Sequence, residues 1–308
     1  MNITLNIGFV CTAINPYYAE EYKIRNESEK QLTKILENFN VKLICFHKTI
    51  FTKNDSLEAE VFFKNKVDFL LIQTSSCSAG EQLYPLTDIT NKIGIWAIPD
   101  KEVEGDVKLH SLVSTSHFLG IIKKNLKEKK IKTKWFYNFA DTEEFKNKFI
   151  ITIRSLLGVK KIFNSKIGLI GGISPGFDNM KVDKYKLKQN IGVTIEEETI
   201  SNLIKIAEKF DNELINKEIN KIKSVATSIS VSDEKSFDRV TRIYFALKKI
   251  REQNNWDSLA VQCWSQFQEL YNIAPCMAYS WMGSEDGIAV SCEGDVQGSI
   301  SMLLLNYL

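Results

Sequence analysis

Short apolar runs alternate with longer amphipathic segments along the chain, and this alternation constrains the fold more than any other feature of the sequence. The apolar runs are rich in Ile, Val, Leu and Phe and cover residues 7–11, 41–46, 69–73, 93–99, 166–172, 258–263 and 287–292. Runs of this length with few polar positions are typical of parallel strands that are buried on both faces. Because helical patterns separate them, the sequence predicts an α/β fold with doubly wound parallel sheets.

Amphipathic helices are expected between the strands, since apolar residues recur there at helical spacing. The expected helices cover residues 18–38, 56–64, 145–157, 197–210, 212–228, 233–251 and 296–308. In the second of these, Ser56 is expected to cap the helix, and Leu57, Val61 and Phe62 are expected to form its buried side.

The length of the chain, 308 residues, corresponds to about two domains of roughly 150 residues each. Residues 145–157 are expected to connect two halves of the molecule, and the run at 166–172 starts a new α/β unit. We therefore predict two α/β domains in tandem, at residues 1–163 and 164–308.

The charge balance argues against nucleic acid as a partner. Lys plus Arg number 40 and Asp plus Glu number 38, which gives a net charge of +2. Such a balance lacks the excess of positive charge that is typical of nucleic-acid-binding proteins. Lysines do crowd residues 123–134, which could be a nucleic-acid patch. The expected alternative is the solvated end of a helix, followed by a turn and an edge strand at residues 135–137.

A membrane partner is not expected either. No apolar run reaches the roughly 18 residues of a membrane-spanning helix. The amino terminus lacks the basic and apolar regions of a signal peptide. We therefore expect a cytoplasmic protein.

Cysteine and glycine patterns exclude two common kinds of site. The chain has six cysteines, at Cys11, Cys45, Cys77, Cys263, Cys276 and Cys292. They show no CxxC spacing, which argues against a zinc motif or a redox motif and favours reduced, mostly buried thiols. The glycines of residues 168–176 do not match a dinucleotide fingerprint, because Gly168 lies inside the strand and Pro175 interrupts the following helix. A tight turn at the carboxyl edge of a sheet is expected there instead.

The histidines do not form a convincing metal motif. His110 and His117 are seven residues apart, a spacing that could place both on one helix, but no acidic residue lies between them. We expect these two and His47 to be packed or surface residues.

Two carboxylates flank a glycine where the last predicted strand meets the last predicted helix. These are Glu293 and Asp295, on either side of Gly294. Glycine allows the backbone to bend close to a ligand, and carboxylates so placed could bind a hard divalent cation or act as a base. The alternative is that Asp295 caps the helix and Glu293 lies in a solvated turn. The sequence leaves both interpretations open.

Several segments of the second half resemble the L-fucose isomerase-like proteins, which are related to L-fucose and L-arabinose isomerases. The most specific are residues 257–264 with their Cys-Trp pair, Pro275-Cys276, and residues 287–298 with the sequence Cys-Glu-Gly-Asp. Residues 167–177 are similar to the opening of that family's second domain, and residues 190–196 fit its next strand.

The resemblance implies two Rossmann-like domains, a third β-rich domain, and an aldose–ketose isomerase that forms homo-oligomers. Its metal, usually manganese, is bound by two acidic residues and one histidine. By position, Glu293 or Asp295 supplies one acidic ligand. The other belongs after Trp264, where Glu269 is the nearest carboxylate beyond Gln266 and Gln268.

The chain also departs from the family pattern. It ends inside an apolar segment, residues 300–308, so the β-rich domain and its histidine have no counterpart and a fragment or short form is expected. Asn15 stands near the position where fucose isomerases carry a substrate-contacting arginine. Together with Trp264 and Gln268 it is a candidate contact for a small-molecule sugar.

These observations predict a metal-dependent aldose–ketose isomerase, or the first two domains of one, that acts through an ene-diol. Catalysis and metal binding are both assigned to Glu293, Asp295 and Glu269. A non-catalytic carbohydrate-binding or regulatory module is the alternative. A nucleotide-dependent oxidoreductase is disfavoured by the missing fingerprint.

Overall fold

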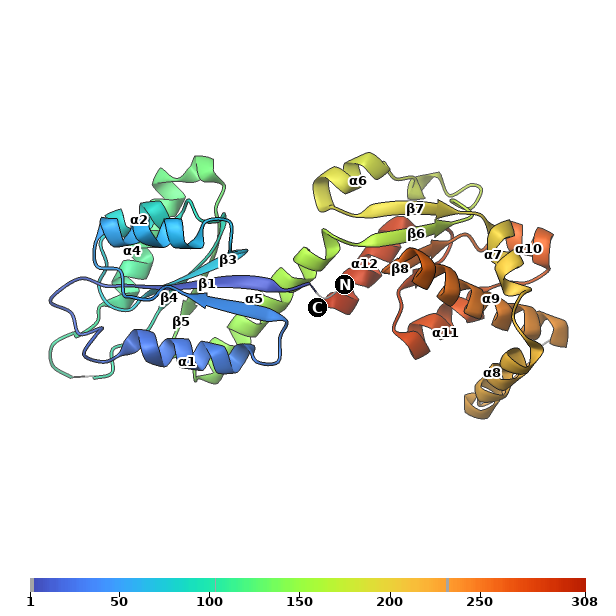
Figure 1. Ribbon diagram of the computed structural model, residues 1–308, viewed down its shortest axis with the longest axis horizontal. Coiled ribbons are helices and arrows are strands. Elements are labelled where there is room, and N and C mark those ends of the chain that lie inside the picture. The colour runs from blue at the N-terminus through green and yellow to red at the C-terminus, as the bar shows by residue number, and fades with distance from the viewer. Residues whose placement is uncertain (1–2, 103, 231–232) are drawn as a thin grey trace. The chain divides into compact units, whose positions relative to one another are not determined.

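The computed structural model describes residues 3–102, 104–230 and 233–308, and the chain forms two compact units that divide between Leu157 and Gly158 (Figure 1). The division falls inside helix α5 (Glu143–Ile162). The boundary predicted near residue 163 lies at the end of the same helix.

The first unit is built on a five-stranded sheet in the order β2-β1-β3-β4-β5, in which every pairing is parallel. Its strands are β1 (Leu5–Thr12), β2 (Val41–Cys45), β3 (Phe69–Thr74), β4 (Lys92–Ala97) and β5 (Lys132–Tyr137). Its helices are α1 (Ile24–Leu36), α2 (Lys53–Phe63), α3 (Leu83–Leu86), α4 (Ser111–Asn125) and the greater part of α5, with 3₁₀ turns at Gly80–Gln82 and Lys127–Lys129.

Both faces of this sheet are buried, because consecutive strand residues point to opposite sides. Leu71 packs with α1 and α5 on one face, whereas Leu70 and Ile72 pack with α2 and α4 on the other. Figure 1 shows these helix pairs on opposite sides of the strands. The structure therefore confirms the predicted doubly wound α/β architecture.

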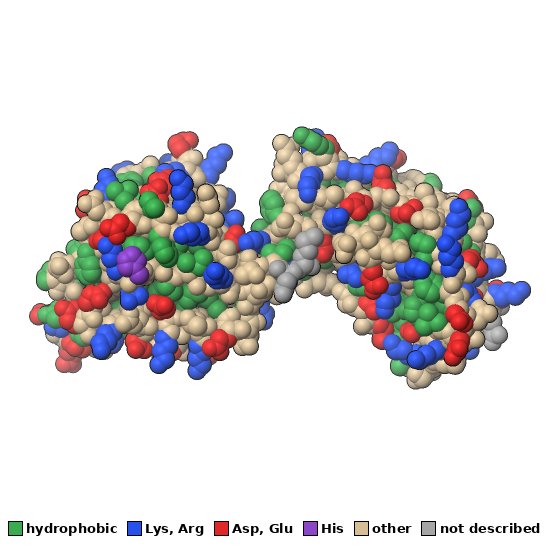
Figure 2. Space-filling model, in the orientation of Figure 1, with side chains coloured by type: hydrophobic (Ala, Val, Ile, Leu, Met, Phe, Trp, Pro, Cys, Tyr) green, Lys and Arg blue, Asp and Glu red, His purple; other side chains and the backbone are tan. Residues whose placement is uncertain are grey.

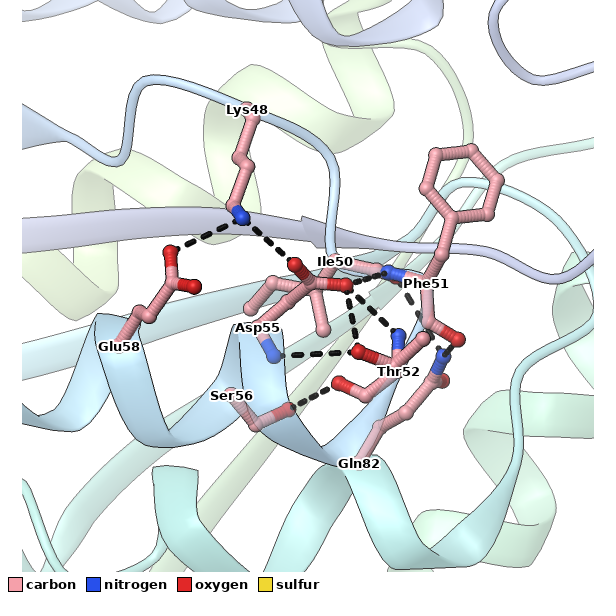
Figure 3. A network of polar contacts seen from close by, with 8 residues as sticks. All are labelled: Lys48, Ile50, Phe51, Thr52, Asp55, Ser56, Glu58 and Gln82. Carbon is pink, nitrogen blue, oxygen red and sulfur yellow. Dashed lines mark hydrogen bonds and ion pairs between the residues drawn. The ribbon is translucent and has the colours of Figure 1, made fainter.

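Helix α2 begins earlier than the sequence suggested (Figure 3). Thr52 is its N-cap: the Thr52 side chain accepts from the Asp55 amide, and the Asp55 carboxylate accepts from the Thr52 amide. This reciprocal pair is a capping box. Ser56 lies within the helix and is buried, so the prediction that Ser56 caps it is wrong.

The earlier start also rotates the buried stripe of α2. Ala59 and Phe63 are fully buried, whereas Leu57 and Val61 are 44% and 73% exposed. The predicted buried side was therefore wrong for Leu57 and Val61, although Phe62 does pack partly buried against the core. The side of a helix that meets the core depends on where the cap fixes its first turn.

Asp55 is the centre of the polar network at this cap. Its carboxylate accepts hydrogen bonds from the Lys48 ammonium (2.6 Å), the Thr52 hydroxyl (2.8 Å) and the backbone amides of Thr52 (2.9 Å) and Phe51 (3.1 Å). Burial alone would raise the pKa of Asp55, but these donors outweigh it and lower that pKa to about 2.

The lysine-rich segment forms the end of α4, a 3₁₀ turn and the edge strand β5, as predicted, although the strand begins at Lys132 rather than at Trp135. Lys132 and Lys134 are exposed on β5, where charge discourages pairing with another chain. Basic and acidic side chains are interspersed on the visible face of each unit (Figure 2). Among the described residues, no helix is long and apolar enough to cross a bilayer.

The second unit is built on a four-stranded parallel sheet in the order β7-β6-β8-β9. Its strands are β6 (Lys166–Ile170), β7 (Thr194–Glu198), β8 (Ser258–Val261) and β9 (Val290–Ser291). Its helices are α6 (Lys184–Ile191), α7 (Ile200–Ala207), α8 (Asn212–Val225), α9 (Glu234–Asn254), α10 (Gln266–Tyr271), α11 (Cys276–Asp286) and α12 (Val296–Tyr307), with a 3₁₀ turn at Asp178–Met180.

Two boundaries of the second unit differ from the predicted ones, and one helix was not predicted. The strand expected at 190–196 begins at Thr194, because the preceding residues complete α6, and the helix expected at 197–210 begins at Ile200. Thr199 caps α7 by accepting from the Asn202 amide, so the strand and the helix are separated by a single residue. Helix α11 was not predicted.

Gly168 fixes the packing of one face of this sheet. A Cβ at this position would lie 2.1 Å from the Trp256 ring, so only glycine lets the indole pack this closely against β6. Trp256 belongs to the core formed with α7, α9, α10 and α11, and α6 and α12 cover the other face. Gly168 therefore has a packing role inside the strand, in agreement with the absence of a dinucleotide fingerprint.

Candidate functional site

Three loops meet at the carboxyl edge of the second sheet. They follow β6, β8 and β9, and parallel strands present these ends at one edge, where ligands of open α/β sheets bind. The Ser174 amide donates to the Glu293 carbonyl (3.1 Å), and the Gly294 amide donates to the Val261 carbonyl (3.1 Å). The Gln266 side chain donates to the Gly171 carbonyl (3.2 Å). The three loops therefore form one connected structure.

Glycine makes this close approach possible. Gly171 and Gly172 have φ values of 81° and 78°, which produce the predicted tight turn. A Cβ on Gly294, whose φ is 73°, would lie 2.1 Å from the Gly172 carbonyl oxygen. The neighbouring Glu293 also has a left-handed conformation, with φ of 59°, which is uncommon for a residue that carries a Cβ.

Buried polar atoms without a partner gather at this edge. They are the Ser174 hydroxyl, the Gln262 side-chain carbonyl and the Glu293 Oε2 atom, three of the four such atoms found among the described residues. Buried polar groups in folded proteins are nearly always hydrogen-bonded, to the protein, to water or to a ligand. This edge is therefore the part of the described structure with the most buried polar atoms available to bind a polar molecule.

Two cysteines lie beside Glu293. The Cys263 thiol donates to Glu293 Oε1 (3.1 Å), and the Cys292 thiol donates to the Cys263 sulfur (3.0 Å). These two sulfurs and the carboxylate lie within 4.8 Å of one another and form the only group of three potential metal ligands found among the described residues. Burial raises the pKa of the Cys263 thiol, and its bonds with Cys292 and Glu293 raise it further, so Cys263 remains a protonated donor.

Asp295 caps α12. Its Oδ1 atom accepts from the Gly298 amide at 2.9 Å. This is the structural alternative that the sequence left open for Asp295, whereas Glu293 is partly buried and bonded rather than free in a solvated turn. The two carboxylates of the Cys-Glu-Gly-Asp motif therefore have different local roles.

The remaining predicted residues are placed as follows. Glu269 is exposed on α10 and accepts from the Ser265 hydroxyl at 2.6 Å. Trp264 is 51% exposed, and its peptide bond to Ser265 is cis. Gln268 lines a separate surface hollow with Asn272 and Met277.

Two further predicted residues belong to the first unit. Asn15 is exposed after β1, and its peptide bond to Pro16 is cis. His110 precedes α4, and its ring packs against Tyr17 with ring centroids 5.5 Å apart, as expected for a packed histidine.

Sequence reasoning missed the residues that accompany Glu293. Ser174, Gln262, Cys263 and Cys292 each follow a strand by one to four residues, and this shared position is the signal that could have identified them. Spacing rules for metal motifs could not, since Cys263 and Cys292 are 29 residues apart.

A manganese ion fits the described arrangement poorly. Manganese prefers carboxylate, carbonyl and water oxygens, but the ligand group described here combines one carboxylate with two sulfurs. Asp295 and Glu269 are engaged in hydrogen bonds of their own helices and lie outside that group. Manganese binding by the three carboxylates stays a prediction.

Known proteins resemble this chain over most of its length. No known family profile matches it. It is 24% identical over 245 residues to proteins named sulfoquinovose isomerase from Priestia aryabhattai and Priestia megaterium, which covers 79% of this chain and 54% of each relative. A protein of the same name from Alkalicoccus urumqiensis is 23% identical over 245 residues. The chain spans about half the length of these curated relatives.

Proposed function

We propose that this chain is part of a sugar isomerase that interconverts an aldose and a ketose, related to the L-fucose isomerase-like proteins. Similarity to sulfoquinovose isomerases over 79% of the chain supports the reaction class. The observation that carries the location is the convergence of three unpartnered buried polar atoms at the carboxyl edge of the second sheet. Sulfoquinovose, the sugar in the names of the relatives, is the first substrate to test.

Glu293 is the residue that we assign to proton transfer. Aldose–ketose isomerisation removes a proton from one of two neighbouring carbons and returns it to the other through an ene-diol, which a positioned carboxylate can do. Glu293 Oε1 is held by the Cys263 thiol at 3.1 Å, whereas Oε2 has no partner. The bonded oxygen orients the carboxylate, and the unbonded oxygen accepts the proton.

Ser174 and Gln262 are suited to hold the sugar. The Ser174 hydroxyl can donate to or accept from a sugar hydroxyl, and the Gln262 carbonyl can accept from one. Satisfying these two buried atoms supplies binding free energy and fixes the orientation of the carbon chain relative to Glu293. Hydride transfer is not required, which agrees with the missing dinucleotide fingerprint.

Manganese binding by Glu293, Asp295 and Glu269 stays a prediction of the family resemblance, and no step of the proposed reaction depends on it. To bind a cation, Asp295 and Glu269 would have to give up their present hydrogen bonds. The homo-oligomer, the cytoplasmic location and the absence of nucleic-acid and membrane partners also stay predictions.

The test is isomerisation in deuterated water. The purified protein is incubated with sulfoquinovose, L-fucose or D-glucose, with and without Mn²⁺, and products are followed by NMR. We expect ketose formation from one sugar and deuterium at C2 of the recovered aldose, because an ene-diol exchanges that proton with solvent.

Variants connect this activity to the site. Glu293→Gln keeps the shape of the side chain and should lower kcat by about 100-fold or more, the usual range for loss of a general base. Glu213→Gln, an exposed carboxylate on α8, is the matched control and should leave kcat unchanged. A folded protein that converts none of the sugars under any of these conditions, or one that is unaffected by Glu293→Gln, would contradict the proposal.

A carbohydrate-binding module without catalysis is the second candidate. It is favoured by the local hydrogen bonds of Asp295 and Glu269, because among the three predicted carboxylates only Glu293 has a buried oxygen without a hydrogen-bond partner. Isothermal titration that shows sugar binding, together with an absence of deuterium exchange at C2, would support this candidate over the isomerase.

A further inference from the structure

Cys263 and Cys292 converge from neighbouring strands. Cys263 follows β8 and Cys292 follows β9, and these two strands pair in parallel. Their sulfurs are 3.0 Å apart, and Glu293 Oε1 is 3.1 Å from the Cys263 sulfur. The second carboxylate oxygen, Oε2, has no partner. This gives two thiols and one partly unsatisfied carboxylate on a single small patch.

The separations are close to those of a tetrahedral zinc site. With Zn–S bonds of about 2.3 Å and Zn–O bonds of about 2.0 Å, tetrahedral angles place two sulfurs roughly 3.8 Å apart and sulfur and oxygen roughly 3.5 Å apart. From the observed 3.0 Å and 3.1 Å, the sulfurs must separate by less than about 1 Å, and the carboxylate oxygen must move by a few tenths of an ångström. Rotation of the side chains can supply such shifts.

The backbone around the three ligands is already fixed. The Glu293 carbonyl accepts from Ser174, the Gly294 amide donates to Val261, and the Asp295 amide donates to the Cys292 carbonyl at 3.0 Å. The cap on α12 anchors the segment that follows. Ligand groups held in this way lose little conformational entropy when they bind a cation.

The donor chemistry selects the kind of cation. Thiolates are soft ligands that favour zinc over manganese, magnesium or calcium. Three protein ligands leave the fourth tetrahedral position open, which is the arrangement of zinc sites that also bind a water or a substrate oxygen.

We propose that Cys263, Cys292 and Glu293 form a zinc-binding site with one open coordination position at the carboxyl edge of the second sheet. Each thiol gives up its proton to solvent when its sulfur binds the cation. The proposal depends on this geometry and not on the isomerase activity, so failure of the isomerisation test would leave it standing.

The test uses Co²⁺ as a coloured substitute for zinc. The reduced protein, kept in a phosphine reductant without air, is titrated with cobalt chloride and then with zinc chloride. We expect one equivalent of cobalt, a thiolate-to-cobalt charge-transfer band in the near ultraviolet, the strong visible bands of tetrahedral cobalt, and displacement of both by one equivalent of zinc.

Variants identify the ligands. Cys263→Ser and Cys292→Ser should each remove part of the charge-transfer band and weaken zinc binding by about 100-fold. Loss of a residue that only supports a ligand weakens metal binding by about 10–100-fold, so loss of a ligand should reach at least the top of that range. Glu293→Gln should weaken binding while retaining the band. Two variants are controls: Cys276→Ser, on the first turn of α11 and outside the ligand group, and Cys77→Ser, in the first unit. Both should bind cobalt and zinc as the unchanged protein does.

Circular dichroism of each variant shows whether it is folded. A cobalt spectrum without the sulfur band, or zinc affinity unchanged in folded Cys263→Ser and Cys292→Ser variants, would overturn the proposal. Loss of binding in Cys276→Ser would overturn the assigned ligand set.

Discussion

Asp295 offers the sharpest test of how the Cys-Glu-Gly-Asp segment works, because capping and metal binding predict different effects of the same substitutions. The Asp295 carboxylate accepts from the Gly298 amide at 2.9 Å. Replacing an N-cap by alanine costs about 1 kcal/mol, and loss of a negative charge beside a helix amino terminus costs about 0.5 kcal/mol more. Asp295→Ala should therefore destabilise α12 by about 1.5 kcal/mol. Asp295→Asn keeps the hydrogen-bond acceptor and should cost only about 0.5 kcal/mol.

Hydrogen exchange measures this locally. Peptides that cover Val296–Tyr307 are followed by mass spectrometry at constant pH. A change of about 1.4 kcal/mol is tenfold in an opening equilibrium, so these peptides should exchange roughly tenfold faster in Asp295→Ala. In Asp295→Asn they should exchange about twofold faster. Peptides from β1, in the other unit, are the internal control and should not change.

Two results would refute the capping argument. One is unchanged exchange of α12 in Asp295→Ala. The other is equal acceleration in Asp295→Ala and Asp295→Asn, since the amide of asparagine caps as well as a carboxylate does. The same two variants report on metal binding, because a cation that uses Asp295 should be lost from both.

Two further predictions concern stability. Asp55 has a pKa of about 2 in the folded protein and 3.8 ordinarily, so its contribution to stability is present above pH 4 and is lost as the pH falls through 2. In urea unfolding, Asp55→Asn should cost about 1–2 kcal/mol at pH 7, after allowance for partial solvent exposure, and little below pH 2. A pH-independent difference would contradict this. Gly168→Ala should destabilise the second unit by about 2 kcal/mol in thermal unfolding, because the new methyl group overlaps Trp256. The control is Gly283→Ala, on the exposed surface of α11, which should be neutral or stabilising by about 0.5–1 kcal/mol. Equal effects of the two substitutions would show that Trp256 can move aside.

The central strands, such as β1, β3, β4 and β8, were predictable because nearly all of their residues are buried. Residues such as Leu71 and Ile95 have neighbours on both sides of the sheet, so the chain must be apolar at consecutive positions. Helices were harder, because their faces depend on where they begin. The cap at Thr52, four residues before the predicted one, left Val61 in solvent. Helix α11 was missed because its apolar residues form no single stripe.

The candidate site was predicted in part. Glu293 was identified because two carboxylates around a glycine at the end of a strand are unusual, and its unpartnered oxygen is consistent with a functional role. Its neighbours depend on strand order, and nothing in the sequence states that β8 lies between β6 and β9. Once that order is known, Cys263 and Cys292 become neighbours despite the 29 residues between them.

Strand order also sets when each unit can form during synthesis. In the first unit, β1 pairs with β2 and β3, and β4 and β5 are added in sequence, so the sheet grows as the chain emerges. In the second unit, β6 cannot pair with β8 until α6, α7, α8 and α9 have been synthesised.

At about 5–20 residues per second, synthesis of the segment from the end of β6 to the start of β8 takes roughly 4–18 s. During that time one edge of β6 is exposed to chaperones and to other nascent chains. Slow codons or chaperone depletion should therefore affect the yield of the second unit, with its candidate site, more than that of the first.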